Sequence, residues 1–147
     1  EHGESIKYYE NGQVKEKVNY ENGQVHIKRN FKDGYLDGER IEYYENGQVK
    51  EKRNFKEGQA DGELILYYEN SQVKYKINYK NGKEHGESIR YYEDGQVKEK
   101  AYYEDGQVKG KVNYENGQVK GKVNYENGQV KEKVYYENGQ VKGKKKF

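Results

Sequence analysis

Residues 14–31 read VKEKVNYENGQVHIKRNF, and this stretch contains the pattern that decides the fold. At its centre stands Asn22-Gly23, a pair typical of type I′ hairpin turns, because both central positions of that turn need a positive φ. The flanking residues are rich in Val, Tyr and Lys and show no helix cap or 3.6-residue apolar period, so they predict two strands. Alternation puts Val14, Glu16, Val18 and Tyr20 on one face of the first strand, and Lys15, Lys17 and Asn19 on the other.

A two-residue loop at Asn22-Gly23 also predicts which residues of the two strands face each other. The pairs are Tyr20 with Val25, Val18 with Ile27, and Val14 with Phe31. The same rule at Asn116-Gly117 pairs Tyr114 with Val119, Val112 with Gly121, and Val108 with Tyr125. Apolar residues meet on one side of the first hairpin, which favours a specified antiparallel register.

An aromatic residue followed by this turn pattern recurs along the whole chain at steps of 11 or 13 residues. The anchors are Tyr9, Tyr20, Phe31, Tyr44, Phe55, Tyr68, Tyr79, Tyr92, Tyr103, Tyr114, Tyr125, Tyr136 and Phe147, with Ser71 replacing Gly in one turn. Mixed 11- and 13-residue units form 24-residue hairpin repeats over residues 1–92, and uniform 11-residue units fill residues 93–147. The sequence therefore predicts one continuous repeat array over residues 1–147, without a separate domain.

The 13-residue units carry a second Gly four positions after the first, as in Gly34 and Gly38, which predicts a longer turn at one edge of the sheet. In the strands that follow, pairs such as Ile89 and Tyr91 alternate out of phase with the anchor Tyr92. Either a bulge flips these strands, or the second face also carries isolated apolar pairs.

The composition predicts a thin sheet. Val, Ile, Leu and Phe together make up 25 of 147 residues, which is too little for a two-layer core. A net charge of only +2 and 18 tyrosines argue against disorder. We therefore expect an all-β fold, an elongated single-layer antiparallel β-meander of repeated hairpins that is solenoid-like.

The sequence offers little for catalysis. The absence of Cys excludes disulfides, thiolate metal sites and cysteine nucleophiles, and no run of apolar residues is long enough to span a membrane. The three histidines, His2, His26 and His85, stand in turn or polar-strand positions, and the carboxylates recur periodically beside the turns. We expect no catalytic residues, no metal site and no cofactor, and hence not an enzyme.

The unit GESIRYYEDGQVKEKAYYEDGQVKG, residues Gly86–Gly110, resembles the MORN repeat in its bacterial variant form. Chains with the YYENGQ pattern also resemble the YwqK-type antitoxin family. The resemblance implies a MORN-type fold and a non-enzymatic scaffold that binds proteins, with proposed contacts to phospholipid. The antitoxin likeness implies that the chain binds and neutralises a cognate toxin.

Two sets of residues are candidates for partner contact. One is a row of strand-end tyrosines that offers rigid amphipathic contact area: Tyr79, Tyr92, Tyr103, Tyr114, Tyr125 and Tyr136. The other is a stripe of lysines expected on one face, suited to an anionic surface: Lys98, Lys100, Lys109, Lys111, Lys120 and Lys122.

The expected partner is a protein, for example a toxin, and anionic lipid is a second partner that the lysines favour more than nucleic acid. Unpaired edge strands also predict end-to-end homodimers. The alternatives left open are a cell-surface glycan-binding repeat, an anionic-membrane-binding repeat and a purely structural spacer. The chain starts inside a repeat and lacks Met, which predicts a longer protein, so a cytoplasmic and a secreted or cell-surface location are both open.

Overall fold

The computed structural model describes residues 2–147 and confirms the all-β antiparallel meander. The strands are β1 (Gly3–Tyr8), β2 (Val14–Glu21), β3 (Gln24–Lys32), β4 (Tyr35–Tyr43), β5 (Val49–Lys56), β6 (Gln59–Ala60), β7 (Gly62–Tyr67), β8 (Val73–Lys80), β9 (Lys83–Glu84), β10 (Gly86–Tyr91), β11 (Val97–Glu104), β12 (Gln107–Glu115), β13 (Gln118–Glu126), β14 (Gln129–Glu137) and β15 (Gln140–Lys146). Within the part of the chain that the structure describes, no helix is long and apolar enough to cross a membrane.

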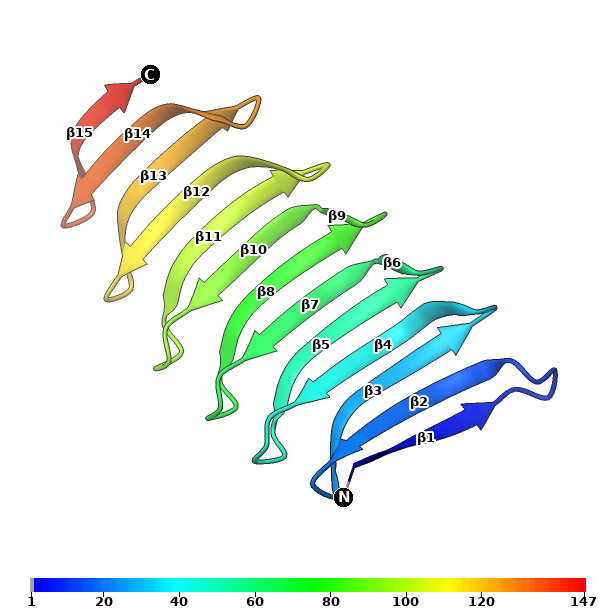
Figure 1. Cartoon of the computed structure of the whole chain (residues 1–147). Coiled ribbons are helices and arrows are strands. Elements are labelled where there is room, and N and C mark those ends of the chain that lie inside the picture. Colours follow the sequence, from blue (N-terminus) through cyan, green and yellow to red (C-terminus); the bar gives the residue numbers. More distant parts are fainter. Residues whose placement is uncertain (1) are drawn as a thin grey trace.

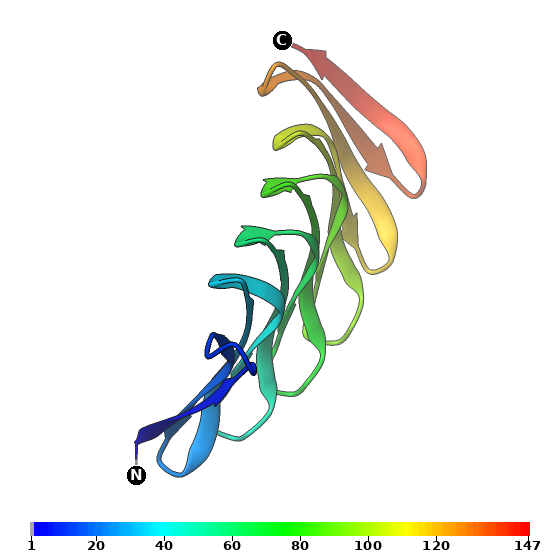
Figure 2. The same cartoon turned by 90° about the vertical axis from the view of Figure 1, so that its right-hand side faces the viewer.

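The strands follow one another in chain order across a single 15-stranded sheet, except that β6 pairs only with β5 and β9 only with β8 (Figure 1). Figure 1 shows the strands from β3 to β14 side by side, with alternating directions and nearly aligned long axes, along an elongated sheet. Figure 2 shows that the strands are bent and that successive hairpins stack along one long axis. Most packing is therefore between neighbouring hairpins, as in other repeat proteins.

Turns alternate between the two long edges of the sheet, which we name after one glycine of each. The Gly82 edge carries the turns that contain Gly12, Gly34, Gly58, Gly82, Gly106 and Gly128, and the Gly95 edge those that contain Gly23, Gly47, Ser71, Gly95, Gly117 and Gly139. Three turns on the Gly82 edge are joined to the preceding repeat, because the backbone N–H groups of Gly58, Gly82 and Gly106 donate to carbonyl oxygens of Leu36, Ala60 and Glu84 at 2.8–2.9 Å.

Eight of the turns are the tight two-residue turns that the sequence predicts. In the first of them Asn22 and Gly23 both have positive φ, 53° and 78°. The prediction is wrong for four others, which span Tyr9–Gln13, Tyr44–Gln48, Tyr68–Gln72 and Tyr92–Gln96. In these longer turns only the fourth residue is left-handed, and the Tyr N–H donates to the Gln carbonyl oxygen at 2.8 Å.

The predicted register holds next to the turns and then shifts. Tyr20 pairs with Val25 and Tyr114 with Val119, as expected. The predicted pairs of Val18 with Ile27 and of Val112 with Gly121 are wrong, because a β-bulge follows the turn and moves every later pair by one residue. Val18 therefore pairs with Lys28, and Val112 with Lys122.

The second Gly of each 13-residue unit does not lengthen the turn, which corrects that expectation. The turn at Asn81-Gly82 keeps two residues, and Lys83–Glu84 continue as the short strand β9. The chain then resumes pairing at Gly86, whose φ of 81° is favourable only for glycine. The extra residues are thus absorbed inside the sheet.

The best-buried apolar cluster lies in the middle of the array on one face, which we call the Leu64 face. Leu64 and Ile77 pair directly, Tyr75 lies beside them, and Leu66 and Tyr79 pack against the cluster. Leu64 is 4% exposed. The opposite face, which carries Ile65, is called the ladder face.

Candidate binding surface

The six tyrosines predicted as one row lie in two rows at opposite edges of the sheet. Tyr79, Tyr103 and Tyr125 precede turns of the Gly82 edge, whereas Tyr92, Tyr114 and Tyr136 precede turns of the Gly95 edge (Figure 1). Five of the six are half-buried, and Tyr92 is 36% exposed. The rows also differ in face, since Tyr79 packs against the Leu64 cluster whereas Tyr114 and Tyr136 lie on the ladder face, so the expectation of a single row is corrected to two.

Tyrosines of the four longer turns tie one repeat to the next. The hydroxyls of Tyr9, Tyr44, Tyr68 and Tyr92 donate to backbone carbonyls of the following repeat at 3.0, 2.6, 2.7 and 3.2 Å. The ammonium of a lysine lies 5.6–5.8 Å from the centre of each of these rings. Tyr92 and Lys98, two of the predicted site residues, therefore form one such structural clamp.

Two edge tyrosines and one neighbour keep their hydroxyls protonated over a wide pH range. Burial, with a smaller effect of Glu84, raises the pKa of both Tyr79 and Tyr103. A hydrogen bond to Glu87 on the neighbouring strand raises the pKa of Tyr102. These hydroxyls remain available as hydrogen-bond donors at neutral pH.

Besides the anchor Phe147, which is 61% exposed, several strongly exposed aromatic side chains are residues for which the sequence predicted no contact with a partner. Tyr35 is 60% exposed, Tyr135 48% and Tyr102 45%. Tyr102 pairs with Gly110, and Tyr135 pairs with both Gly121 and Gly143. The rings of Tyr102 and Tyr135 therefore lie beside glycines, which have no side chain to cover them. For these two tyrosines the sequence contains a signal, a Tyr-Tyr doublet in a strand whose neighbouring strands contain Lys-Gly-Lys.

The predicted lysine stripe is divided between the two faces. Lys100 and Lys122 both pair with Val112, but Lys111 pairs with Ala101 and points to the opposite face. The other three, Lys98, Lys109 and Lys120, are extra residues of bulges. The expectation of one face is therefore wrong, because each bulge changes the alternation of its strand.

A different and longer row of lysines emerges on the ladder face. In this row, which we call the lysine ladder, lysines alternate with aliphatic residues on successive strands. Its rungs, each paired with the next, are Val18, Lys28, Ile41, Lys52, Ile65, Lys76, Ile89, Lys100, Val112, Lys122, Val134 and Lys144. Among residues 2–147, an ion pair is found for one lysine of the ladder. The Nζ of Lys28 lies 3.3 Å from a carboxylate oxygen of Glu16.

Two further rows flank the lysine ladder on the same face. Toward the Gly82 edge, acidic side chains stand two residues from the aliphatic rungs of five strands: Glu16, Glu39, Glu63, Glu87 and Glu132. Toward the Gly95 edge, tyrosines pair with valines: Tyr20–Val25, Tyr43–Val49, Tyr67–Val73, Tyr91–Val97, Tyr114–Val119 and Tyr136–Val141. The ladder thus separates an acidic row from an apolar one.

Charged residues on the Leu64 face form an internal cluster. Glu51 is 8% exposed and accepts a hydrogen bond from Nε of Arg53, while a guanidinium nitrogen of Arg40 lies 3.7 Å from its other oxygen. Arg40 also lies 3.7 Å from Glu42. Because these charges are paired and partly buried, they orient one another and leave little net charge for a ligand.

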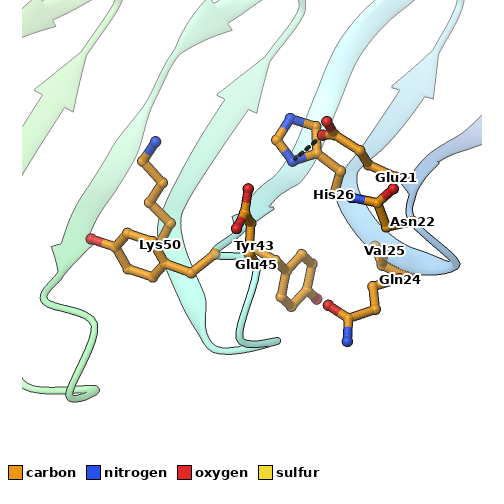
Figure 3. Close-up of a pocket in the computed structure, with 9 residues that line it drawn as sticks. Glu21, Asn22, Gln24, Val25, His26, Tyr43, Glu45 and Lys50 are labelled. Atoms are coloured by element: carbon orange, nitrogen blue, oxygen red, sulfur yellow. Dashed lines mark ion pairs between the residues drawn. The ribbon is translucent and has the colours of Figure 1, made fainter. Parts of the chain in front are cut away.

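Figure 3 shows an open hollow of about 440 Å³ at the Gly95 edge, between the turns at Gly23 and Gly47. His26 lines it, and its Nδ1 lies 3.7 Å from a carboxylate oxygen of Glu21. Lys50 and Tyr43 project from the facing side. The hollow presents mixed polar and apolar groups to a partner. No group of three or more His, Asp or Glu that could hold a metal is found over residues 2–147.

Comparison with known families agrees with this repeat geometry. The pattern described as MORN repeat variant matches nine times, over residues 1–22, 15–33, 36–57, 60–81, 84–105, 98–116, 110–127, 119–138 and 129–147. The chain belongs to the MORN repeat variant family. No curated protein matches it. MORN repeats are generally non-catalytic modules that bind proteins or membranes.

Proposed function

We propose that this MORN repeat chain is a non-enzymatic module that binds a protein partner stoichiometrically, either as an antitoxin that neutralises a toxin or as a scaffold. The observation that supports this most is that exposed aromatic side chains stand on both faces of the sheet: Tyr102 on the ladder face, where it pairs with Glu87, and Tyr135 on the Leu64 face, next to the rung Val134. Tyrosine offers a large contact area at low entropic cost, and it is enriched in protein-binding surfaces.

The two edge rows add contact area on each face, because Tyr79 packs against the Leu64 cluster whereas Tyr114 and Tyr136 lie on the ladder face. Tyr79, Tyr103 and Tyr125 would serve a partner at the Gly82 edge, and Tyr92, Tyr114 and Tyr136 one at the Gly95 edge. Their half-burial means that each presents a ring edge and a hydroxyl rather than a free side chain. Each is proposed as a flanking contact for the exposed tyrosine of its own face.

The test is quantitative affinity capture from cells of the source organism. The tagged chain is compared with a double variant, Tyr102→Ser and Tyr135→Ser, and with the matched control Tyr102→Phe and Tyr135→Phe. Both positions are exposed, so we expect every form to keep the strand signature in circular dichroism. Recovery of one protein near 1:1 by the parent and the Phe control, and its loss with the Ser variant, supports the proposal.

Two further measurements test separately which edge binds the partner and whether the chain acts as an antitoxin. Hydroxyl-radical footprinting of the complex identifies the protected edge, because only one of the two tyrosine rows should lose reactivity. Expression of the recovered partner with and without the chain tests the antitoxin role through cell growth. A capture that yields no stoichiometric protein would refute the proposal.

Membrane attachment is the second candidate, because the lysine ladder presents a row of cations. The acidic row beside it opposes this reading, since a flat anionic surface would meet both rows. Co-sedimentation with vesicles of anionic lipid, at low and high salt, distinguishes the two candidates.

A further inference from the structure

The lysine ladder has a fixed spacing. Neighbouring strands of a sheet lie about 4.7–4.9 Å apart, so lysines on every second strand stand about 9.4–9.8 Å from one another. Six lysines follow this rule, namely Lys28, Lys52, Lys76, Lys100, Lys122 and Lys144. Because the long axes of the strands are nearly aligned (Figure 1), this row runs along the length of the sheet.

The flanking rows restrict what the ladder can bind. Glu39, Glu63 and Glu87 lie on the strands between its lysines and repel any anion that extends toward the Gly82 edge. On the other side stand the apolar tyrosine–valine pairs, which are half-buried apart from Tyr20 and Val141. The ligand that fits this surface is therefore a narrow chain that carries negative charges at regular intervals and apolar groups between them.

An extended peptide in polyproline II conformation has the matching period. Its rise of about 3.1 Å per residue and three residues per turn bring every third side chain to the same face about 9.3 Å apart. A β-strand returns to the same face every second residue, at about 6.7 Å, which does not match. Over the five intervals of the ladder the polyproline II mismatch accumulates to roughly 0.5–2.5 Å, which flexible lysine side chains can cover.

We propose that the lysine ladder binds an acidic, extended segment of the protein partner, in polyproline II conformation, with a carboxylate at every third residue. The inference rests on the proposed function, since it names the chemistry of part of the partner. Six lysines correspond to a segment of about 18 residues. Between the carboxylates, apolar side chains or proline rings would lie over rungs such as Ile41, Ile65 and Ile89.

The chemistry of the ladder favours a peptide over an anionic polysaccharide. Lysine ammonium groups only donate hydrogen bonds, and the rungs between them are aliphatic. A sugar chain would need acceptors for its hydroxyl groups, and aromatic faces to cover its rings. A carboxylate with an apolar spacer needs neither.

The test uses two synthetic peptides of equal length and composition. One contains six Glu-Pro-Ser triplets, and the other has the same residues with its Glu gathered into two blocks. Binding of each to the full chain is measured by fluorescence anisotropy at low and high salt. We expect the triplet peptide to bind at least about tenfold tighter at low salt, because only its carboxylates match the ladder.

The chain supplies a matched pair of variants on the same three strands. The ladder variant carries Lys28→Gln, Lys52→Gln and Lys76→Gln. The control carries Lys32→Gln, Lys56→Gln and Lys80→Gln, four residues further along each strand at the Gly82 edge. Both lose three charges. Loss of three surface ion pairs should weaken the triplet peptide about 10- to 100-fold in the ladder variant and less than about threefold in the control.

Equal affinity for the two peptides, or equal loss in the two variants, overturns the inference. So does tighter ladder-dependent binding of hyaluronan or of anionic vesicles, measured in the same assay. A failure of this inference can be distinguished from a failure of the proposed function. If the captured protein is retained by the ladder variant and lost with the Tyr102 and Tyr135 serine variant, the function stands and the ladder inference fails.

Discussion

Replacing Leu64 by Ala should reveal that the centre of the Leu64 face carries much of the stability of the array. Leu64 is 4% exposed and packs against Tyr75 and Ile77. Buried Leu→Ala substitutions cost about 2–5 kcal/mol, including a term for the cavity left behind. A sheet with a single layer can close part of that cavity, so we expect the lower part of the range, about 2–3 kcal/mol.

The next residue provides the control. Ile65 has the same number of carbons, lies in the same strand and points to the ladder face, where it is half-buried. Its replacement by Ala removes less buried surface and opens no closed cavity, so the expected loss is about 1 kcal/mol.

Hydrogen exchange at the amides of β7 and β8 is the appropriate assay, because repeat arrays open locally. The free energy of local opening is read for the parent and for both variants, with urea unfolding followed by circular dichroism as a second measure. Equal losses for Leu64→Ala and Ile65→Ala, or a larger loss at Ile65, would refute the assignment of the main packing to the Leu64 face.

Three further results are expected. Changing Tyr68 to Phe removes a 2.7 Å hydrogen bond to the Tyr91 carbonyl and should cost about 0.5–1.5 kcal/mol in urea unfolding, and no loss would contradict the clamp. Changing Ser71, which has a φ of 70°, to Gly should relieve strain and raise the thermal midpoint by a few degrees, whereas a lower midpoint would contradict it. A hydrogen bond from Lys7 holds the pKa of Glu16 below its ordinary value of 4.5, so its contribution to stability is complete above about pH 4.5 and is lost as pH falls through the folded pKa. An NMR titration of the Glu16 carboxyl should show this depressed midpoint, and Lys7→Gln should move it upward.

The strands and their order could be predicted because they depend on local patterns. Each run of Val, Tyr and Lys between two turn signals forms a strand, and short connections place consecutive strands side by side. Pairs next to a tight turn, such as Tyr20 with Val25, follow from the turn length alone.

The type of each turn could not be predicted from its own residues. Residues 91–98 and 102–109 both read YYEDGQVK. The first copy forms a long turn with only Gly95 left-handed, and the second forms a tight turn with Asp105 and Gly106 both left-handed. Since the local sequence is the same, the strands that flank each copy decide the outcome, and the pairing of those strands is a tertiary property.

The candidate surface was predicted in its residue types but not in its arrangement. Bulges decide which face a lysine occupies. Nothing in the sequence around a lysine at a bulge distinguishes it from the other lysines of the chain. The out-of-phase pair of Ile89 and Tyr91 was the available sign that strands change face, and both residues lie on the ladder face. From the sequence alone, the cause was open between a bulge that flips the strand and a second face with isolated apolar pairs. The structure shows that β10 keeps its alternation and that the bulge lies opposite, in β11, where Lys98 is the extra residue.

Because of the bulges, the number of residues in a repeat does not by itself determine which residues reach a given face. Neighbouring rungs of the lysine ladder lie 13 residues apart between Lys28 and Ile41, 12 between Lys100 and Val112, and 10 between Val112 and Lys122. All of these steps return the chain to the same face, although a hairpin with a two-residue turn and no bulge would permit only odd ones. Insertions and deletions of one or two residues can therefore accumulate at the turns of such an array during evolution, while the chemical order of its exposed surface is inherited unchanged.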